Sequence, residues 1–265
     1  MTRVLSGAVL LVFAVGVVWF APPLAFFIVA EVLLVLGVTE YVALAVASHH
    51  EIPAVPAAVA AMVTCAAFAR LALGGVSVPL DVVLMSVLVA LGALTLPRWS
   101  AGRDAVGLAA ASVFPAIYLG LPIGAMVAIR ETRGPEGLFL LMLTVIISDT
   151  AQYYCGRTFG RRLLAPAISP KKTIAGAVGG FVFGAMALAA LGHWWLPAVP
   201  VALRAAFGAA IVALGIAGDL FESMLKRSAG VKDSSALIPG HGGILDRIDA
   251  LLFAAPVYYV VLQYV

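Results

Sequence analysis

Long, uninterrupted apolar runs constrain the fold of this chain more than any other feature of its sequence. Most runs have about the 20 residues that an α-helix needs to cross a bilayer. Only 11% of the 265 residues are charged, compared with about a quarter in an ordinary soluble domain. A transmembrane β-barrel would instead show alternating segments of about ten residues. The sequence therefore predicts an all-α, polytopic integral membrane protein.

The apolar runs predict about nine transmembrane helices. They cover residues 4–20, 24–48, 54–73, 78–96, 105–129, 137–154, 174–191, 199–221 and 248–265. We interpret the whole chain, 1–265, as one transmembrane domain. Within it, the spans of residues 1–136 are expected to be a scaffold, and residues 137–265 are expected to carry the catalytic spans and loops. Residues 130–136 are expected to form a short charged turn between the fifth and sixth spans.

The distribution of basic residues predicts an orientation in the membrane. With nine spans and a cytoplasmic N-terminus, twelve of the sixteen Lys and Arg residues fall inside, and Arg70, Arg130, Arg133 and Arg204 fall outside. Cytoplasmic loops of membrane proteins carry such an excess of positive charge. The two polar loops after the sixth and eighth spans, and a polar active site formed by them, are therefore expected to face the cytoplasm.

Residues 218–249 form a dense polar segment in this apolar chain. The segment holds five of the thirteen acidic residues and four of the sixteen basic ones. Asp219 and Glu222 are three residues apart, so they share one face of a helix, and Asp246 and Asp249 repeat the spacing. Carboxylates on two helix ends can jointly hold a hard cation. We expect Asp219 and Asp246 to bind Mg²⁺, and the carboxylates could also serve a second cation.

Glycines and basic side chains in two loops indicate phosphate binding. Gly242 and Gly243 follow His241, and glycine lets backbone amides approach an anion closely. The same segment supplies the basic residues Lys226, Arg227, Lys232 and Arg247. The earlier loop has Ser169, Lys171 and Lys172 just before a glycine-rich helix start, where a phosphate group is favoured. Carboxylates for Mg²⁺, glycine amides and basic side chains together suit phosphates.

These motifs resemble those of the phosphatidate cytidylyltransferase (CDP-diacylglycerol synthase) family. The resemblance in the later segment is carried by Asp219, Ser223, Leu225, Lys226, Arg227, Lys232, Asp233, Ser235, Ile238, Pro239, His241, Gly242, Gly243, Asp246, Arg247 and Asp249. In the earlier segment it is carried by Asp149, Tyr153, Gly156, Arg157, Phe159, Gly160, Ser169, Pro170, Lys171, Lys172, Thr173 and Gly176. The family usually has Glu where this chain has Ala175, which leaves the detail of the earlier loop open.

The resemblance implies a reaction and a set of site residues. Phosphatidic acid would attack the α-phosphorus of CTP, giving CDP-diacylglycerol and pyrophosphate. The expected catalytic residues are Asp219, Asp246, Lys226, Arg227, Lys232, Asp233, His241 and Arg247. The expected substrate-binding residues are Ser169, Lys171, Lys172, Gly242, Gly243, Ser223, Asp149, Glu222 and Asp249. Glu222 and Asp249 are expected to be of second rank, as outer-shell or lipid-phosphate partners of Arg227 and Arg247. The resemblance also suggests a homodimer in the cell membrane, with no nucleic-acid partner.

Two other functions fit parts of the pattern. A cytidylyltransferase that acts on an isoprenoid ether-lipid phosphate would share the headgroup chemistry and differ in the lipid groove. A transporter could use Glu31, Glu40 and Asp149 inside the membrane, but this alternative leaves the Gly242-Gly243 motif unexplained. For Glu31 and Glu40 the sequence leaves two interpretations open: a carboxyl that bonds to neighbouring groups, or a polar group that faces a cavity.

Overall fold

Helices account for most of the chain, and they form two compact units. The computed structural model describes residues 2–69, 78–101, 104–238, 240 and 242–265, without the side chains of residues 2–6 and 8. The first unit consists of Met1–Ala128 and Ser228–Arg247. The second unit consists of Ile129–Arg227 and Ile248–Val265. The polar segment 218–249 is thus divided between them, so Asp219 and Asp246 belong to different units.

The first unit is built from apolar helices joined by short turns. It contains α1 (Thr2–Phe20), α2 (Pro23–Ala47), α3 (Ala54–Phe68), α4 (Leu80–Thr95), the 3₁₀ turn η1 (Leu96–Arg98), α5 (Ala105–Pro115), the π-helical turn η2 (Ala116–Gly120) and the first residues of α6. Proline at the first position begins α2, where the missing N–H costs no helical hydrogen bond. The Asp104 carboxylate caps α5 by accepting from Gly107 N at 2.9 Å.

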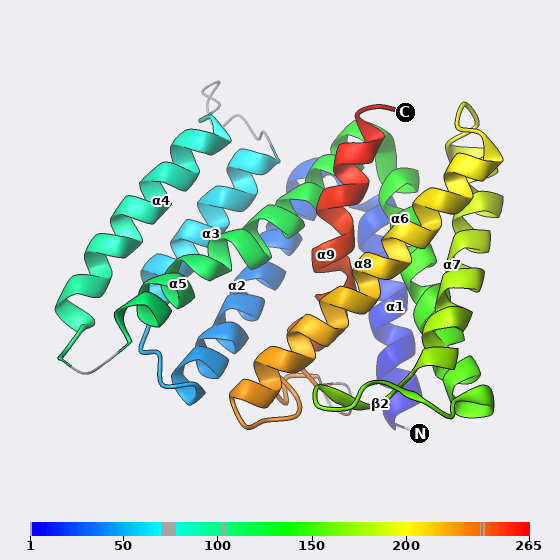
Figure 1. Cartoon of the computed structure of the whole chain (residues 1–265). Helices are drawn as coiled ribbons and strands as arrows, with labels where there is room; N and C mark the ends of the chain where they lie inside the picture. The colour runs from blue at the N-terminus through cyan, green and yellow to red at the C-terminus, as the bar shows by residue number, and fades with distance from the viewer. Residues whose placement is uncertain (1, 70–77, 102–103, 239, 241) are drawn as a thin grey trace. The chain divides into compact units, whose positions relative to one another are not determined.

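Helix α3 packs against several other elements of the first unit. Figure 1 shows α3, α4 and α5 side by side, and Ala60, Val83, Leu91 and Ala116 form a buried apolar cluster among them. At Gly120 an added Cβ would lie 2.7 Å from the carbonyl oxygen of an α3 residue. The absence of a side chain there allows the two backbones to come close, as is typical of packed membrane helices.

The charged turn predicted at residues 130–136 coincides with a kink at Gly134, where two helical segments meet within α6. Helix α6 (Leu121–Phe159) continues through these residues, and only Gly134 has non-helical angles, with φ 72° and ψ 175°. The left-handed φ favours glycine, and Pro135 follows it. The helix therefore kinks at one residue, and the charged side chains remain on helical backbone. One of them, Arg133, donates to the carbonyl oxygen of Leu262 near the end of α9.

The second unit departs from the all-α prediction by one small hairpin. After α6 come the antiparallel strands β1 (Leu163–Ala165) and β2 (Ser169–Thr173), then α7 (Ile174–Trp195), α8 (Val201–Ser228) and α9 (Leu245–Leu262). The residues predicted as a polar loop after the sixth span thus contain a strand that ends at the start of α7. Helix α8 extends to Ser228, so the acidic and basic residues expected at its end lie on helical backbone.

Glycines allow the helices of the second unit to pack closely. A Cβ at Gly180 of α7 would lie 2.6 Å from Gln152 of α6, and one at Gly208 of α8 would lie 2.8 Å from Ala185 of α7. Between α8 and α9, a Cβ at Gly218 would overlap the carbonyl oxygen of Asp249. Small residues at such crossings are characteristic of membrane helices. Close approach brings polar side chains of neighbouring helices together.

The helical segments identify a multi-pass membrane protein. Five segments of the described chain are long and apolar enough to cross a membrane: Pro23–Ala47, Leu80–Arg98, Ala105–Phe159, Ile174–Trp195 and Val201–Ser228. Val9–Phe20 and Ala54–Phe68 are shorter apolar helices. The count of nine spans stays a prediction, and residues 70–73 of the predicted third span lie outside the described residues. The division into a scaffold of residues 1–136 and a catalytic part of residues 137–265 also stays a prediction.

Candidate functional site

An ion pair joins the two predicted motifs within the second unit. The ammonium Nζ of Lys172, on β2, lies 2.5 Å from Oδ2 of Asp219, on α8. Asp219 also lies 3.4 Å from the hydroxyl of Ser223, one turn further along the helix. The predicted phosphate-binding lysine and the predicted metal-binding carboxylate therefore meet at one place.

The hairpin holds Lys172 beside the first turn of α7. Thr173 is the N-cap of that helix, and its hydroxyl accepts from Gly176 N at 3.1 Å. The end of α6 approaches this cap closely, because a Cβ at Gly160 would lie 2.8 Å from Oγ1 of Thr173. A lysine next to a helix N-terminus suits an anion. Lys171, its neighbour on the strand, is exposed.

Carboxyl groups outnumber ammonium groups around Asp219. Asp149 of α6 and Asp249 of α9 both interact electrostatically with Asp219, and Asp249 also faces the charge of Glu222. Two of these groups have local donors: Gln152 Nε2 donates to Asp149 at 2.9 Å, and the backbone N–H of the residue after Asp249 donates to its Oδ1 at 2.8 Å. Like charges at such a site favour the arrival of a cation.

Glu222 has a partner on its own helix that the sequence analysis did not name. Glu222 forms an ion pair with Lys226, one turn along α8, where Arg227 had been expected. The Glu222 side chain is completely buried and that of Lys226 is 11% exposed. Arg227 instead donates from Nε to the carbonyl oxygen of Ile168, 3.4 Å away, just before β2. Lys226 is therefore paired inside the helix, and Arg227 contacts the turn of the hairpin.

In the first unit, Asp246 organises the turn that precedes α9. Its Oδ2 accepts from Ser234 N at 3.0 Å, from Ser234 Oγ at 2.8 Å and from Gly243 N at 2.8 Å. Ile238 N donates to the carbonyl of Gly242 at 2.9 Å, which closes the turn. Gly242 has φ 78°, and a Cβ there would lie 2.6 Å from Oδ2 of Asp246. The glycine is thus required both by backbone angle and by space.

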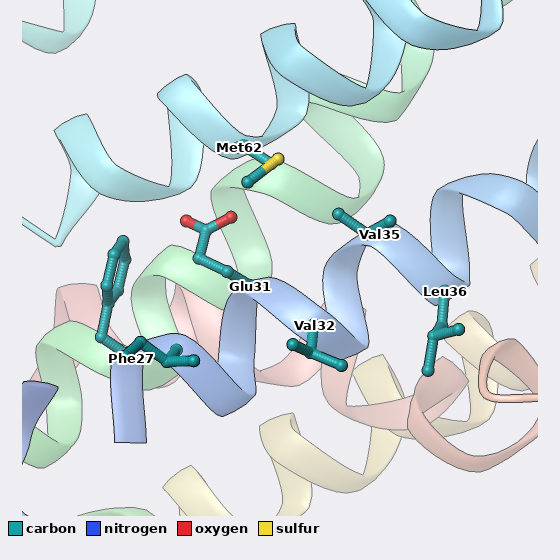
Figure 2. A pocket seen from close by; sticks show the side chains of 7 residues that line it. Phe27, Glu31, Val32, Val35, Leu36 and Met62 are labelled. Carbon is teal, nitrogen blue, oxygen red and sulfur yellow. The ribbon is translucent and has the colours of Figure 1, made fainter. Parts of the chain in front are cut away.

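The two glutamates of α2 have different surroundings. Glu40 is buried and accepts hydrogen bonds from the turn around Asp246. Glu31 lines an apolar pocket of 480 Å³ with Phe27, Val35, Met62 and other alkyl side chains. Figure 2 shows its carboxyl group directed from α2 toward the helix that carries Met62. For Glu40 the interpretation as a group bonded to its neighbours is confirmed, whereas Glu31 faces a cavity.

The sequence matches the model of the cytidylyltransferase family over residues 1–265. The chain belongs to that family. Several curated relatives are named phosphatidate cytidylyltransferase, and three of them show the extent of the similarity. That of Aquifex aeolicus is 37% identical over 153 residues, which are 57% of this chain and 56% of the relative. That of Haemophilus influenzae is 46% identical over 131 residues, 46% of this chain and 45% of the relative. That of Brucella suis is 38% identical over 172 residues, 63% of this chain and 60% of the relative. The chain thus spans about half the length of the curated relatives it matches.

Most of the predicted site residues of this cytidylyltransferase-family chain fall into the two clusters. The second unit gathers Asp149, Lys172, Asp219, Glu222, Ser223, Lys226 and Asp249, with Ser169 and Lys171 on the same strand as Lys172. The first unit gathers Gly242, Gly243 and Asp246. Lys232, Asp233 and Arg247 are exposed. His241 lies outside the described residues.

The carboxylates of the site fit Mg²⁺ bound with few protein ligands. Among the residues that the structure describes, no three His, Cys, Asp or Glu side chains lie close enough together to hold a metal ion. Mg²⁺ is commonly bound by one or two carboxylates, with waters and substrate phosphates completing its coordination. The oxygen-only donors around Asp219, in excess over the lysines, match this chemistry.

The sequence did not predict the contacts of three residues that hold the candidate site residues in place. Gln152 bonds to Asp149, Ser234 bonds to Asp246, and Glu40 holds the turn that carries Asp246. Gln152 lies three residues after Asp149 on α6, a spacing that predicts contact on a helix. For Glu40 the available signal was a carboxyl inside an apolar run. Its partners lie far along the chain, so no local pattern identifies them.

Proposed function

We propose that this chain transfers CMP from CTP to phosphatidic acid, giving CDP-diacylglycerol and pyrophosphate. The observation that carries the proposal is the ion pair between Lys172 and Asp219, which places a basic strand next to an acidic helix at the start of α7. The names of the matched relatives support it. The substrates are thus CTP from the aqueous phase and phosphatidic acid from the lipid bilayer.

The reaction needs positioning and charge stabilisation more than a protein nucleophile. An oxygen of the phosphatidic acid phosphate forms a bond to the α-phosphorus of CTP, and the bond from that phosphorus to the bridging oxygen breaks. Pyrophosphate leaves with the electron pair. Lys172 is the proposed ligand of a phosphate oxygen, and its 19% exposure and its place beside a helix N-terminus support this role. The lipid phosphate is already an anion at neutral pH, so no covalent enzyme intermediate is required.

Mg²⁺ is the proposed cofactor. Asp219 is the proposed Mg²⁺ ligand of the second unit, and Asp246 is the proposed Mg²⁺ ligand of the first unit. A bound Mg²⁺ supplies charge neutralisation of the phosphates and of the leaving pyrophosphate. Lys172 pairs with Asp219, so it can also keep that carboxylate oriented. A second cation could be held by the carboxyl oxygens of Asp149 and Asp249, which interact electrostatically with Asp219.

The site is proposed to face the cytoplasm of a cell membrane, where CTP is available. The excess of basic residues in the predicted inner loops supports this orientation. It implies a cytoplasmic N-terminus and an external C-terminus, which reporter fusions after Val265 test directly. A cytoplasmic reporter signal there would contradict the count of nine spans.

A homodimer is proposed from the family resemblance alone, and light scattering of the detergent-solubilised chain measures it.

A transfer assay tests the proposal. Purified chain in mixed micelles receives CTP labelled in the α-phosphate, Mg²⁺ and phosphatidic acid. The expected result is labelled CDP-diacylglycerol with one pyrophosphate released per lipid. A parallel reaction with an isoprenoid ether-lipid phosphate separates the two lipid classes. Absence of labelled lipid from both reactions would contradict the proposal.

The alternative function as a transporter is weakened by one contact. Glu40, one of the residues expected to line a transport pathway, is bonded to the turn before α9.

A further inference from the structure

Glu40 holds the turn before α9 at both of its ends. Its Oε1 accepts from Ser235 Oγ at 2.7 Å and from Ile244 N at 2.9 Å. Its Oε2 accepts from Ser234 Oγ at 2.8 Å and from Leu245 N at 2.9 Å. Each oxygen thus receives one serine hydroxyl and one backbone N–H. An ionised carboxylate has four lone-pair positions for these four groups, and the single proton of the Ser234 hydroxyl is shared between Glu40 and Asp246.

The contacts around Glu40 leave little freedom in this turn. Glu40 is 5% exposed, and Gly243 has no room for a Cβ, which would overlap both Glu40 oxygens and the hydroxyl of Ser234. One turn earlier on α2, a Cβ at Gly37 would make ordinary contact with Leu245 at 3.5 Å. The first residues of α9 therefore rest on α2 through both polar and apolar contacts.

Glu40 reaches Asp246 by two routes. Ser234 Oγ lies 2.8 Å from Oε2 of Glu40 and 2.8 Å from Oδ2 of Asp246, so one hydroxyl bridges the two carboxyl groups. The other route is the backbone, because Glu40 binds the N–H groups of Ile244 and Leu245, directly before Asp246. Hydrogen-bonding partners behind a metal ligand fix its orientation.

We propose that Glu40 is a positioning residue for the cytidylyl transfer, which sets the orientation of Asp246 and of the Gly242-Gly243 turn without touching substrate. This inference rests on the proposed function and on Asp246 as a Mg²⁺ ligand. It adds to the site a carboxylate from α2, a helix that otherwise belongs to the predicted scaffold.

The change Glu40→Gln isolates this role with little change in shape. Whichever way the amide is turned, its NH₂ group replaces one carboxylate oxygen and faces one backbone N–H, either that of Ile244 or that of Leu245. One donor at the start of α9 then loses its acceptor and meets another donor. Glu31→Gln is the matched control, because Glu31 is also a buried glutamate of α2 and its oxygens accept no hydrogen bond from the described N–H and O–H groups.

Two measurements test the proposal. The first is amide hydrogen exchange of residues 234–247, measured in detergent with EDTA and without CTP. Glu40→Gln should exchange faster than the wild type in these residues. Glu31→Gln should exchange at the wild-type rate. Steady-state kinetics at a temperature where each variant is folded should show about a tenfold or larger fall in kcat for Glu40→Gln and a higher Mg²⁺ concentration for half-maximal rate. A merely structural role would lower the melting temperature and leave the Mg²⁺ dependence of the folded enzyme unchanged.

A second variant keeps the test decisive if Glu40→Gln does not fold. Ser234→Ala removes the hydroxyl between Glu40 and Asp246 and leaves the two backbone hydrogen bonds of Glu40 in place. Ser234→Ala should raise the Mg²⁺ concentration for half-maximal rate by a smaller factor than Glu40→Gln does. Wild-type exchange at residues 234–247 in the folded variants, or unchanged Mg²⁺ dependence, would overturn the inference. If the wild type forms no labelled lipid, the proposed function fails, and the exchange experiment alone still decides whether Glu40 holds this turn.

Discussion

Nζ of Lys172 lies 2.5 Å from Oδ2 of Asp219, so the last part of β2 and the middle of α8 form one ion pair. The two side chains are 19% and 36% exposed. A partly exposed pair that interacts electrostatically with further carboxyl groups, Asp149 and Asp249, can exchange partners when a phosphate or a cation arrives. The ion pair distinguishes two adjacent lysines for which the sequence predicts the same role. Lys172 is paired with Asp219, whereas Lys171 is exposed on the strand.

Replacing Lys172 should therefore cost more activity than replacing Lys171. Lys172→Ala removes an ammonium group from Asp219 and, in the proposed reaction, from a bound phosphate. A charge-assisted hydrogen bond is worth about 1.5–3 kcal/mol, which is roughly tenfold to a hundredfold in kcat/KM for CTP. Lys171→Ala is the control, and loss of an exposed charge should change kcat/KM by no more than about fivefold. Equal kinetics for the two variants would show that the ion pair has no part in the reaction.

The carboxylates Asp219 and Asp246 should each be needed for the Mg²⁺ dependence. Asp219→Asn keeps the shape of the side chain and removes its charge, and the same holds for Asp246→Asn. Loss of a metal ligand should lower transfer by at least about tenfold to a hundredfold. Rates measured over a Mg²⁺ titration test this, with circular dichroism to confirm that the helices persist. Wild-type turnover of both variants at low Mg²⁺ would mean that these acids serve only to pair with local donors, such as Lys172 and Ser234.

The helices of this fold could be predicted because lipid leaves the backbone few alternatives. In hydrocarbon every N–H and C=O must bond within its own segment, so a long apolar run becomes a helix. Helix α2, predicted as 24–48, spans Pro23–Ala47. Polar stretches carry no such constraint, and the prediction was weaker there. The strands β1 and β2 have only three and five residues, too short for an alternating pattern to stand out.

Lys226, which follows the predicted end of the eighth span at residue 221, was interpreted as a loop residue, and the structure shows why it is helical. Glu222 and Lys226 are four residues apart, so a helix lets them neutralise each other, and the pair can be buried on α8. At residues 130–136, only Gly134 leaves the helical conformation. The sequence showed that charges were present in both places. It did not show which of them would find partners within one turn.

The sequence predicted which residues form the candidate site better than it predicted their hydrogen-bond and ion-pair partners. Asp219, Lys172 and Asp246 were named from motif chemistry, and the structure adds their partners. The role of Glu40 depends on α2 meeting the start of α9, and that contact follows from helix packing that no local pattern encodes. Ser234 was missed for the same reason, since a lone serine in a polar segment carries no distinguishing signal.

The buried pair on α8 should contribute to stability more than to chemistry. Breaking a buried ion pair by removing one partner leaves an uncompensated charge and costs about 3–5 kcal/mol of unfolding free energy. Glu222→Gln and Lys226→Met should therefore each lower the thermal midpoint in detergent. The double variant should recover much of the loss, because both charges are gone. A double variant with the summed loss of the two single ones would show that the two side chains act independently.

Two glycines on one face of α8 give a direct test of the close approach to α9. At Gly218 an added Cβ would overlap the carbonyl oxygen of Asp249, whereas at Gly215 it would lie 3.5 Å from Cβ of Ala250, which is ordinary contact. Alanine favours a helix over glycine by about 0.5–1 kcal/mol, so Gly215→Ala should be neutral or stabilising. Gly218→Ala gains the same propensity, but overpacking costs about 1–3 kcal/mol. Gly218→Ala should therefore lower the thermal midpoint. It should also lower the transfer rate, because relief of the overlap shifts Asp249 relative to Asp219. Thermal unfolding and kcat of the two variants, measured side by side, decide the matter: if Gly218→Ala is as stable and active as Gly215→Ala, the two helices have room to separate and the carboxylate cluster does not depend on their contact.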